Sequence, residues 1–152
     1  MENTDLLQRI KEAVHKHMNN PQEKDCNYIL QQIKARLHAI ACLDENWDGH
    51  DSAVPTEQTI RNSFSFIEAA FKEGLTQLEA DDVYPTPYGS VVLEFKTEQT
   101  GLVSVEIGKE QIGFFTDFKK KPNYALDATQ SDFTEIHPTL KKVLEFLRND
   151  KS

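Results

Sequence analysis

The sequence contains few of the residues that cross-link or stiffen unusual folds. Among its 152 residues are two cysteines, six glycines and six prolines, which excludes a disulfide-stapled miniprotein and a collagen-like fibre. No apolar run approaches the roughly 18 residues of a membrane helix, and the mean hydropathy is -0.58. Hydrophobic residues make up 38% of the chain, too many for a wholly disordered protein. We therefore expect one soluble globular domain over residues 1–152.

Positive charge is also scarce. The chain has 25 acidic residues against 17 Lys and Arg, a formal charge of -8. Because acidic side chains repel phosphates, nucleic acid is an unlikely partner, although the three lysines at 119–121 suit a local phosphate contact. Residues 55–110 hold ten acids and four bases. A solvated acidic surface is the favoured interpretation, and a face for a basic partner is the alternative.

The chain begins without the features of a secretory signal. Residues 1–5 lack both a positive region and an apolar core, so we expect a cytoplasmic protein with no membrane partner. Cys26 and Cys42 are 16 positions apart on one expected helix, which separates them by about 24 Å and prevents a disulfide within that helix. They are interpreted as reduced, small core residues.

Apolar residues recur at helical spacing in four parts of the chain. Residues 1–20 predict a peripheral N-terminal helix, which Pro21 ends. A second helix is predicted to begin near residues 24–25 and has a wide apolar face. The third begins after Thr56, which suits an N-cap, and the last begins near Pro138, which suits a first turn.

Alternating apolar and polar residues predict three strands, at 91–96, 103–107 and 111–118. Tyr84–Gly89 contains two prolines and is predicted as an extended lead-in and a turn. The dozen residues after Asn123 show no clear period. Because a small sheet is unstable with both faces in water, the helices must cover one face. The expected fold is α+β, an antiparallel three- to four-stranded meander packed against amphipathic helices.

A polar loop between the second and third helices matches half of a calcium-binding pattern. Asp44, Asn46, Asp48 and Gly49 fit the sequence D-x-[DN]-x-[DN]-G, in which alternate oxygens converge on the ion. The twelfth position, which provides a bidentate carboxylate in the full pattern, is Pro55, so a complete EF-hand is excluded. A non-standard cation site at Asp44, Asn46 and Asp48 stays open; no cofactor is expected.

The same loop also has a structural interpretation. It contains Trp47, the one tryptophan of the chain, whose large ring is expected to close the end of the helical layer. Asn46 or Asp48 can accept backbone amides within the turn, and Gly49 can adopt a positive φ. The sequence favours this interpretation over metal binding.

His50, next to Asp48 and Asp51, is the best candidate for acid–base chemistry. Carboxylates so close in sequence need not converge, and a solvated loop histidine is the favoured interpretation. No nucleophile elbow surrounds Ser52, and the chain has no glycine-rich phosphate loop. No catalytic residue is therefore assigned.

Two motifs give the chain a family resemblance. The first runs through Asn46-Trp47-Asp48-Gly49-His50 to Ala53 and Pro55, and the second is Pro85-Thr86-Pro87-x-Gly89 before the strand ending in Glu94-Phe95. Over residues 40–116 the chain resembles uncharacterised small bacterial proteins with the pattern N-W-D-G-x-G-A-x-P, then P-x-P-x-G and a short meander. Asp51 stands where the group usually has glycine. The group is similar in setting to mobile-element genes and toxin–antitoxin loci, and the resemblance implies a fold more than an activity.

The polar face of the predicted sheet is the second candidate for binding. Glu94 and Glu106 lie on the polar faces of adjacent strands, where they form an acidic patch if the register brings them together. Two isolated surface carboxylates are the favoured interpretation. Tyr84 and Tyr88 precede these strands, and two further aromatic residues, Phe115 and Phe118, are expected nearby as exposed rings. Aromatic residues rimmed by acids suit a protein-binding face.

These features lead to two hypotheses about function. The favoured one is a non-enzymatic interaction domain, antitoxin-like or immunity-like, that binds a basic protein through Trp47 or the sheet face, and a homodimer through a strand edge is compatible with it. The alternative is a small metal-dependent enzyme or cation-binding module centred on residues 44–51. Metal bound to the purified protein, and lost from Asp48→Ala, would favour the alternative.

Overall fold

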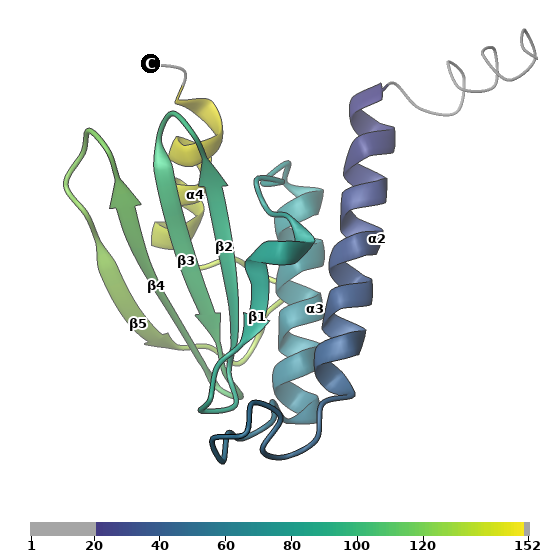
Figure 1. Ribbon diagram of the computed structural model, residues 1–152. Coiled ribbons are helices and arrows are strands. Elements are labelled where there is room, and N and C mark those ends of the chain that lie inside the picture. The colour runs from purple at the N-terminus through teal and green to yellow at the C-terminus, as the bar shows by residue number, and fades with distance from the viewer. Residues whose placement is uncertain (1–20, 151–152) are drawn as a thin grey trace, which may run out of the picture.

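The computed structural model describes residues 21–150 (Figure 1). The helix expected at 1–20 lies outside the described residues. The described chain has three α-helices, one 3-10 turn and five strands, in the order α2 (Pro21–Ala41), α3 (Glu57–Lys72), η1 (Ala80–Asp82), β1 (Val83–Pro85), β2 (Val91–Thr97), β3 (Gly101–Ile107), β4 (Gln111–Phe118), β5 (Ala125–Thr129) and α4 (Pro138–Asn149).

The strands form one antiparallel sheet in the order β1-β2-β3-β4-β5, so the expected α+β meander is confirmed. The expected number of three to four strands is wrong, because the sheet has five. The additional strands are the two edges. In β1, Pro85 ends a three-residue edge strand, where its missing N–H is tolerated. In β5, the small residues Ala125 and Ala128 carry too little apolar character to show a period.

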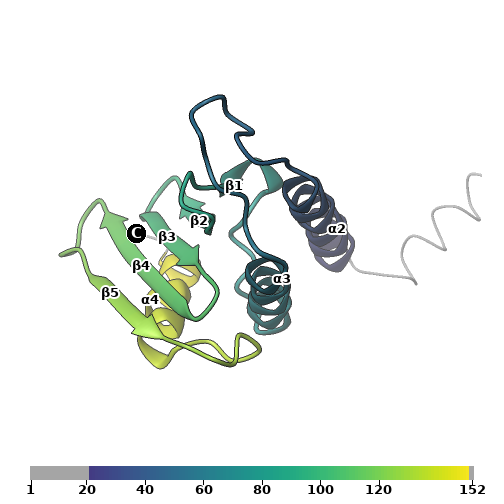
Figure 2. The same ribbon diagram turned by 90° about the horizontal axis from the view of Figure 1, so that it is seen from below.

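The helices lie together on one side of the sheet, and the other side is open (Figure 2). Helices α3 and α4 contact β2 and β3, while α2 packs against α3 and lies beside β1. Alternate residues of the central strands, such as Leu93, Phe95 and Val105, point into this helical side and are fully buried. Phe66 of α3 and Leu147 of α4 meet them in one continuous hydrophobic core.

The helix ends follow local sequence signals. The Thr56 side chain accepts a hydrogen bond from the Thr59 amide and caps α3, as predicted. Gly74, just beyond the end of α3, has a φ of 79°. Helix α4 begins at Pro138, also as predicted, whereas α2 begins at Pro21 rather than near residues 24–25. Proline suits the first turn of a helix, so Pro21 does not prevent α2 from starting there.

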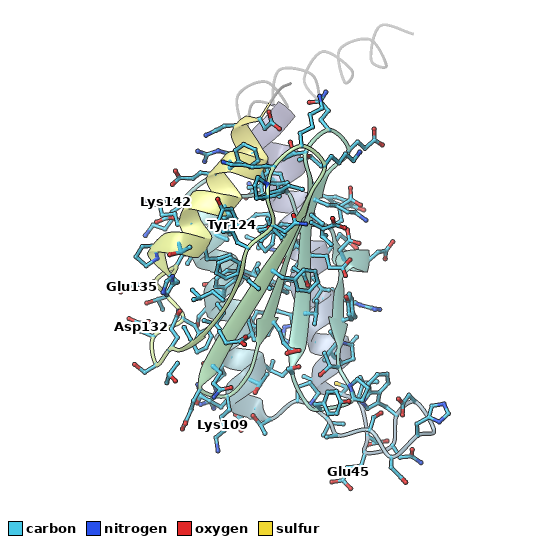
Figure 3. The ribbon with its side chains drawn as sticks, turned by 90° about the vertical axis from the view of Figure 1, so that its left-hand side faces the viewer. Glu45, Lys109, Tyr124, Asp132, Glu135 and Lys142 are labelled. Carbon is cyan, nitrogen blue, oxygen red and sulfur yellow. The ribbon has the colours of Figure 1, made fainter. Side chains whose placement is uncertain are left out.

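The loop between α2 and α3 stands on the open side of the sheet. We call residues 44–55 the tryptophan loop and the side of the sheet away from the helices the open face. Figures 2 and 3 show the loop projecting beyond the open face, with Glu45 at the same end of the molecule as Lys109 of the β3–β4 turn. A bridge between Ala53 and Tyr88 joins the loop to the turn after β1.

The two cysteines differ from their expected position. Both are free thiols, Cys26 half-buried and Cys42 exposed, so the interpretation of both as core residues is wrong. Residue 42 falls just after the end of α2, where the chain turns outward and the apolar stripe of the helix no longer decides burial. Within residues 21–150, no helix is long and apolar enough to cross a membrane.

Candidate functional site

The open face is hollowed into a groove of about 720 Å³ that crosses all five strands, here called the sheet groove. The strand register explains its position. Tyr84, Val92, Glu106, Gly113 and Asp127 are successive partners from β1 to β5 and form one row across the open face. The neighbouring row is Glu94, Ser104, Phe115 and Ala125.

Small residues make the floor of the sheet groove. Ser104, Gly113 and Ala125 line it, so the middle of the sheet has little side-chain volume above it. Gly113 has a specific effect on its partner, because a Cβ at this position would lie 2.5 Å from Asp127 Oδ1. The missing Cβ therefore lets the Asp127 carboxylate lean over β4 into the groove.

Carboxylates give the sheet groove its charge. Glu106 and Asp127 line it on either side of Gly113, and the lining contains no lysine, arginine or histidine. Glu94 stands on the same face, with Ser104 as its direct partner on β3. Glu94 and Glu106 are thus on one face, as predicted, but two positions apart along the sheet rather than opposite each other.

Aromatic rings form the walls of the sheet groove. Tyr88 is 90% exposed and Phe115 is 51% exposed, which is unusual for rings of this size. Tyr84 lines the β1 side of the groove and is half-buried. Phe118 does not belong to this set, and its expected exposure is wrong: it alternates onto the inner face of β4 and packs edge-on against Phe146.

The Tyr84 hydroxyl donates a short hydrogen bond to the Glu94 carboxylate. Partial burial, this hydrogen bond and the charge of Glu94 together raise the pKa of Tyr84 to about 12. The phenol is therefore protonated throughout the neutral range and keeps the Glu94 carboxylate next to the groove. Glu106 also contributes to the shift, which means that its charge is felt at the β1 side of the groove.

Ser104 is the least satisfied polar group of the floor. Its side chain is 5% exposed, yet within residues 21–150 its hydroxyl has no hydrogen-bond partner. In that range, every side-chain oxygen or nitrogen that is fully sealed from solvent has a hydrogen-bond partner. The unpaired Ser104 hydroxyl must therefore reach solvent, and it does so in the groove that Ser104 lines. A ligand in the groove can supply the missing hydrogen bond.

The tryptophan loop is held by hydrogen bonds to its own residues. The Trp47 indole N–H donates to the carbonyl of Ala53 at 3.0 Å, and Asn46 Oδ1 accepts the Asp51 amide at 2.6 Å. The Trp47 ring is half-exposed and is not one of the side chains packed against the core, so the expectation that it closes the helical layer is wrong. Asp51 has a φ of 57°, a conformation that glycine adopts at lower cost.

The oxygens of the proposed cation site are engaged within the loop. Asp48 accepts hydrogen bonds from the Ser52 hydroxyl and the His50 amide, and these bonds lower the pKa of the Asp48 carboxyl. Asp44 is exposed and does not join them. In residues 21–150, no three His, Cys, Asp or Glu side chains are arranged to hold a metal ion. The His50 side chain is exposed, with only its backbone amide bonded to Asp48.

The structure brings most of the predicted binding residues together. Tyr84, Tyr88, Glu94 and Glu106 gather on or beside the sheet groove, whereas Trp47 does not line it. Sequence reasoning missed three residues of the groove, Ser104, Gly113 and Asp127. The alternation of β3 and β4 places Ser104 and Gly113 on the polar face and was a usable signal, but Asp127 required the unpredicted strand β5.

The chain was compared with known proteins by sequence and by structure. Scans of protein-family models, curated proteins and solved structures gave no match to the chain. The resemblance to small bacterial proteins with a tryptophan loop therefore stays a prediction. The functional assignment rests on the residues of the sheet groove.

Proposed function

We propose that this protein is an interaction domain that holds a positively charged segment of another protein in its sheet groove. One observation carries the proposal: carboxylates and exposed aromatic rings share a groove whose lining has no basic side chain. Exposed tyrosine and phenylalanine supply contact area at small entropic cost, and residues of this type dominate binding energy at interfaces. The carboxylates give the partner its charge specificity.

The chemistry of the lining favours binding over catalysis. Ser104 has a free hydroxyl, but the lining contains neither a histidine nor a cysteine that would activate or replace it as a nucleophile. The Tyr84 phenol, with its pKa raised to about 12, does not serve as a base near neutral pH. What these groups offer a ligand is hydrogen bonding, charge and apolar surface.

The net charge of -8 supports the same proposal on the scale of the whole chain. A basic partner is steered toward an acidic protein before contact, which speeds association at low salt. Neutralisation of a basic toxin or nuclease, as in an antitoxin or immunity protein, is one function that such a surface supports. A gene for a basic toxin or nuclease beside the gene of this protein would support that function.

Affinity capture from the native host tests the proposal. The tagged full-length protein is expected to recover a stoichiometric protein partner with a basic segment. A variant with Tyr88→Ala and Glu106→Gln changes an exposed ring and one carboxylate of the groove, and it is expected to lose that partner. Hydrogen exchange in the recovered complex should show protection on β3, β4 and β5.

A matched control separates groove binding from bulk charge. Glu98→Gln removes one exposed carboxylate in the β2–β3 turn, outside the groove lining, and should leave capture unchanged. Equal loss of the partner from both variants would mean that net charge rather than the groove decides binding. Recovery of no partner by the unmodified protein would contradict the proposal directly.

A further inference from the structure

The sheet groove is lined by two carboxylates, Glu106 and Asp127, whose strand positions lie on either side of Gly113. Within residues 21–150, neither Glu106 nor Asp127 has a hydrogen bond or an ion pair. Glu106 and Gly113 are direct partners on adjacent strands, about 5 Å apart, and the Asp127 carboxylate leans over Gly113. The Asp127 carboxylate is therefore about one strand spacing from the backbone of Glu106.

The Ser104 hydroxyl at the floor of the sheet groove lies near the two carboxylates. Ser104, two residues before Glu106 on β3 and on the same face, presents the unpartnered hydroxyl at the floor. Its direct partner on β4 is Phe115, whose ring is half-exposed beside it. The floor thus combines two free carboxylates, one free hydroxyl and one aromatic face.

We infer that this cluster, Ser104, Glu106, Phe115 and Asp127, is a pocket for a single arginine side chain of the partner. The inference rests on the proposed function and specifies the group that the groove recognises. A guanidinium is planar and has five N–H donors, so it can bond two carboxylates and a hydroxyl at once while its face stacks on a ring. A lysine ammonium has three donors and no plane, and therefore matches fewer of these groups.

Gly113 is the positioning residue of the pocket. A Cβ at this position would lie 2.5 Å from Asp127 Oδ1, so the carboxylate would have to move from its place over Gly113. Gly113→Ala therefore keeps both carboxylates but changes their separation. It is expected to weaken arginine binding as Asp127→Asn does, although the net charge of the protein is unchanged.

Peptide titration followed by NMR tests the inference. The probes are three tripeptides, acetyl-Gly-Arg-Gly-amide and its lysine and citrulline counterparts, each added to the full-length protein. The arginine peptide is expected to give saturable shifts at the amides of Ser104, Glu106 and Asp127. The citrulline peptide, which has the same shape without the charge, should give none. Glu106→Gln and Asp127→Asn should each weaken arginine binding about tenfold, since each removes a charge-assisted hydrogen bond.

The controls make the result decisive. Glu98→Gln, outside the groove, should bind the arginine peptide as the unmodified protein does. Ser104→Ala tests the hydroxyl without a change of charge, and the amide spectrum of every variant establishes that it is folded. Equal binding of lysine and arginine peptides, or shifts equally weakened in Glu98→Gln, would overturn the inference.

The two proposals fail in different ways. If the groove variants lose the captured partner while the tripeptides bind without preference, the groove is an interface but not an arginine pocket. If the arginine tripeptide binds at Glu106 and Asp127 but no protein is ever captured, the proposed interaction domain is wrong.

Discussion

At the scale of single residues, Tyr84 links the edge of the sheet to the acids of the groove. Its pKa is raised to about 12, by burial first and by the hydrogen bond to Glu94 second. Below pH 10 the phenol is protonated in both the folded and the unfolded chain, and its stabilising contribution is fully present. Between pH 10 and about 12 only the unfolded chain releases the proton, so the contribution falls as pH rises and is lost above that range.

Tyr84→Phe is therefore expected to lower the free energy of unfolding by about 0.5 to 1.5 kcal/mol at neutral pH, the usual contribution of one hydrogen bond. The difference from the unmodified protein should shrink as pH rises through about 12. Urea unfolding at a series of pH values measures both quantities. Tyr88→Phe is the control, because the Tyr88 ring is 90% exposed and, within residues 21–150, its hydroxyl makes no hydrogen bond. A constant difference for Tyr84→Phe would contradict the assignment.

Trp47 provides a second prediction at the residue scale. The ring is half-exposed and its indole N–H bonds within the loop, so Trp47→Ala should cost about 1 to 2 kcal/mol of unfolding free energy rather than unfold the protein. Trp47→Phe keeps a ring and removes only the hydrogen bond, and should cost less. Both are measured by urea unfolding followed by circular dichroism. A loss near 4 kcal/mol for Trp47→Ala would mean that the ring is part of the core.

At the scale of elements, glycine matters most where two strands turn. Gly101 starts β3 with a φ of 127°, and a Cβ there would lie 2.1 Å from the carbonyl oxygen of Asp117. Gly101→Ala should therefore cost about 3 kcal/mol, because neither backbone can move without breaking the β3–β4 ladder. Gly49 also has a positive φ, 79°, but nothing lies within 4 Å of its Cβ position.

Gly49→Ala is the matched control for that prediction. It also places an alanine at positive φ but lacks the collision, so it should cost only about 1 kcal/mol. Thermal or urea unfolding of both variants separates the two contributions. Equal losses would show that conformation alone, and not the contact with the strand of Asp117, explains the effect at Gly101.

The same elements show what the sequence could and could not predict. Strand β4 was predicted from Gln111 to Phe118, because its buried face alternates with exposed polar positions. Strand β5 gave no signal, because an edge strand with one exposed face needs only small or weakly apolar residues such as Ala125 and Ala128. Its position depends on pairing with β4, which the side chains of residues 125–129 do not themselves encode.

The same limit applies to the candidate site. The acidic and aromatic residues on the predicted strands, such as Glu106 and Tyr84, could be placed on one face from alternation alone. The Asp127 carboxylate could not, since it reaches the groove only because its partner Gly113 lacks a Cβ. In the tryptophan loop, the residue types suggested metal ligands, but the oxygens of Asn46 and Asp48 bond the loop itself.

At the scale of the whole molecule, one hydrophobic core joins the three described helices to the inner face of the sheet. Leu37 of α2 and Leu147 of α4 are both fully buried, and they lie in helices on different parts of that core. If the chain is a single folding unit, Leu37→Ala and Leu147→Ala should each lower its one unfolding transition, by about 2 to 5 kcal/mol. The effect should be global, because both leucines belong to the same hydrophobic core.

Two probes decide whether unfolding is cooperative. Trp47 fluorescence reports on the tryptophan loop near α2, and far-ultraviolet circular dichroism reports on the sheet and all helices. Their midpoints in urea should coincide in the unmodified protein and in both leucine variants. Gln31→Ala, at an exposed position of α2, is the control and should change the free energy of unfolding by no more than about 0.5 kcal/mol. Separate midpoints, with Leu37→Ala shifting only the fluorescence signal, would mean that α2 and α3 unfold independently of the sheet. That result would contradict a single domain.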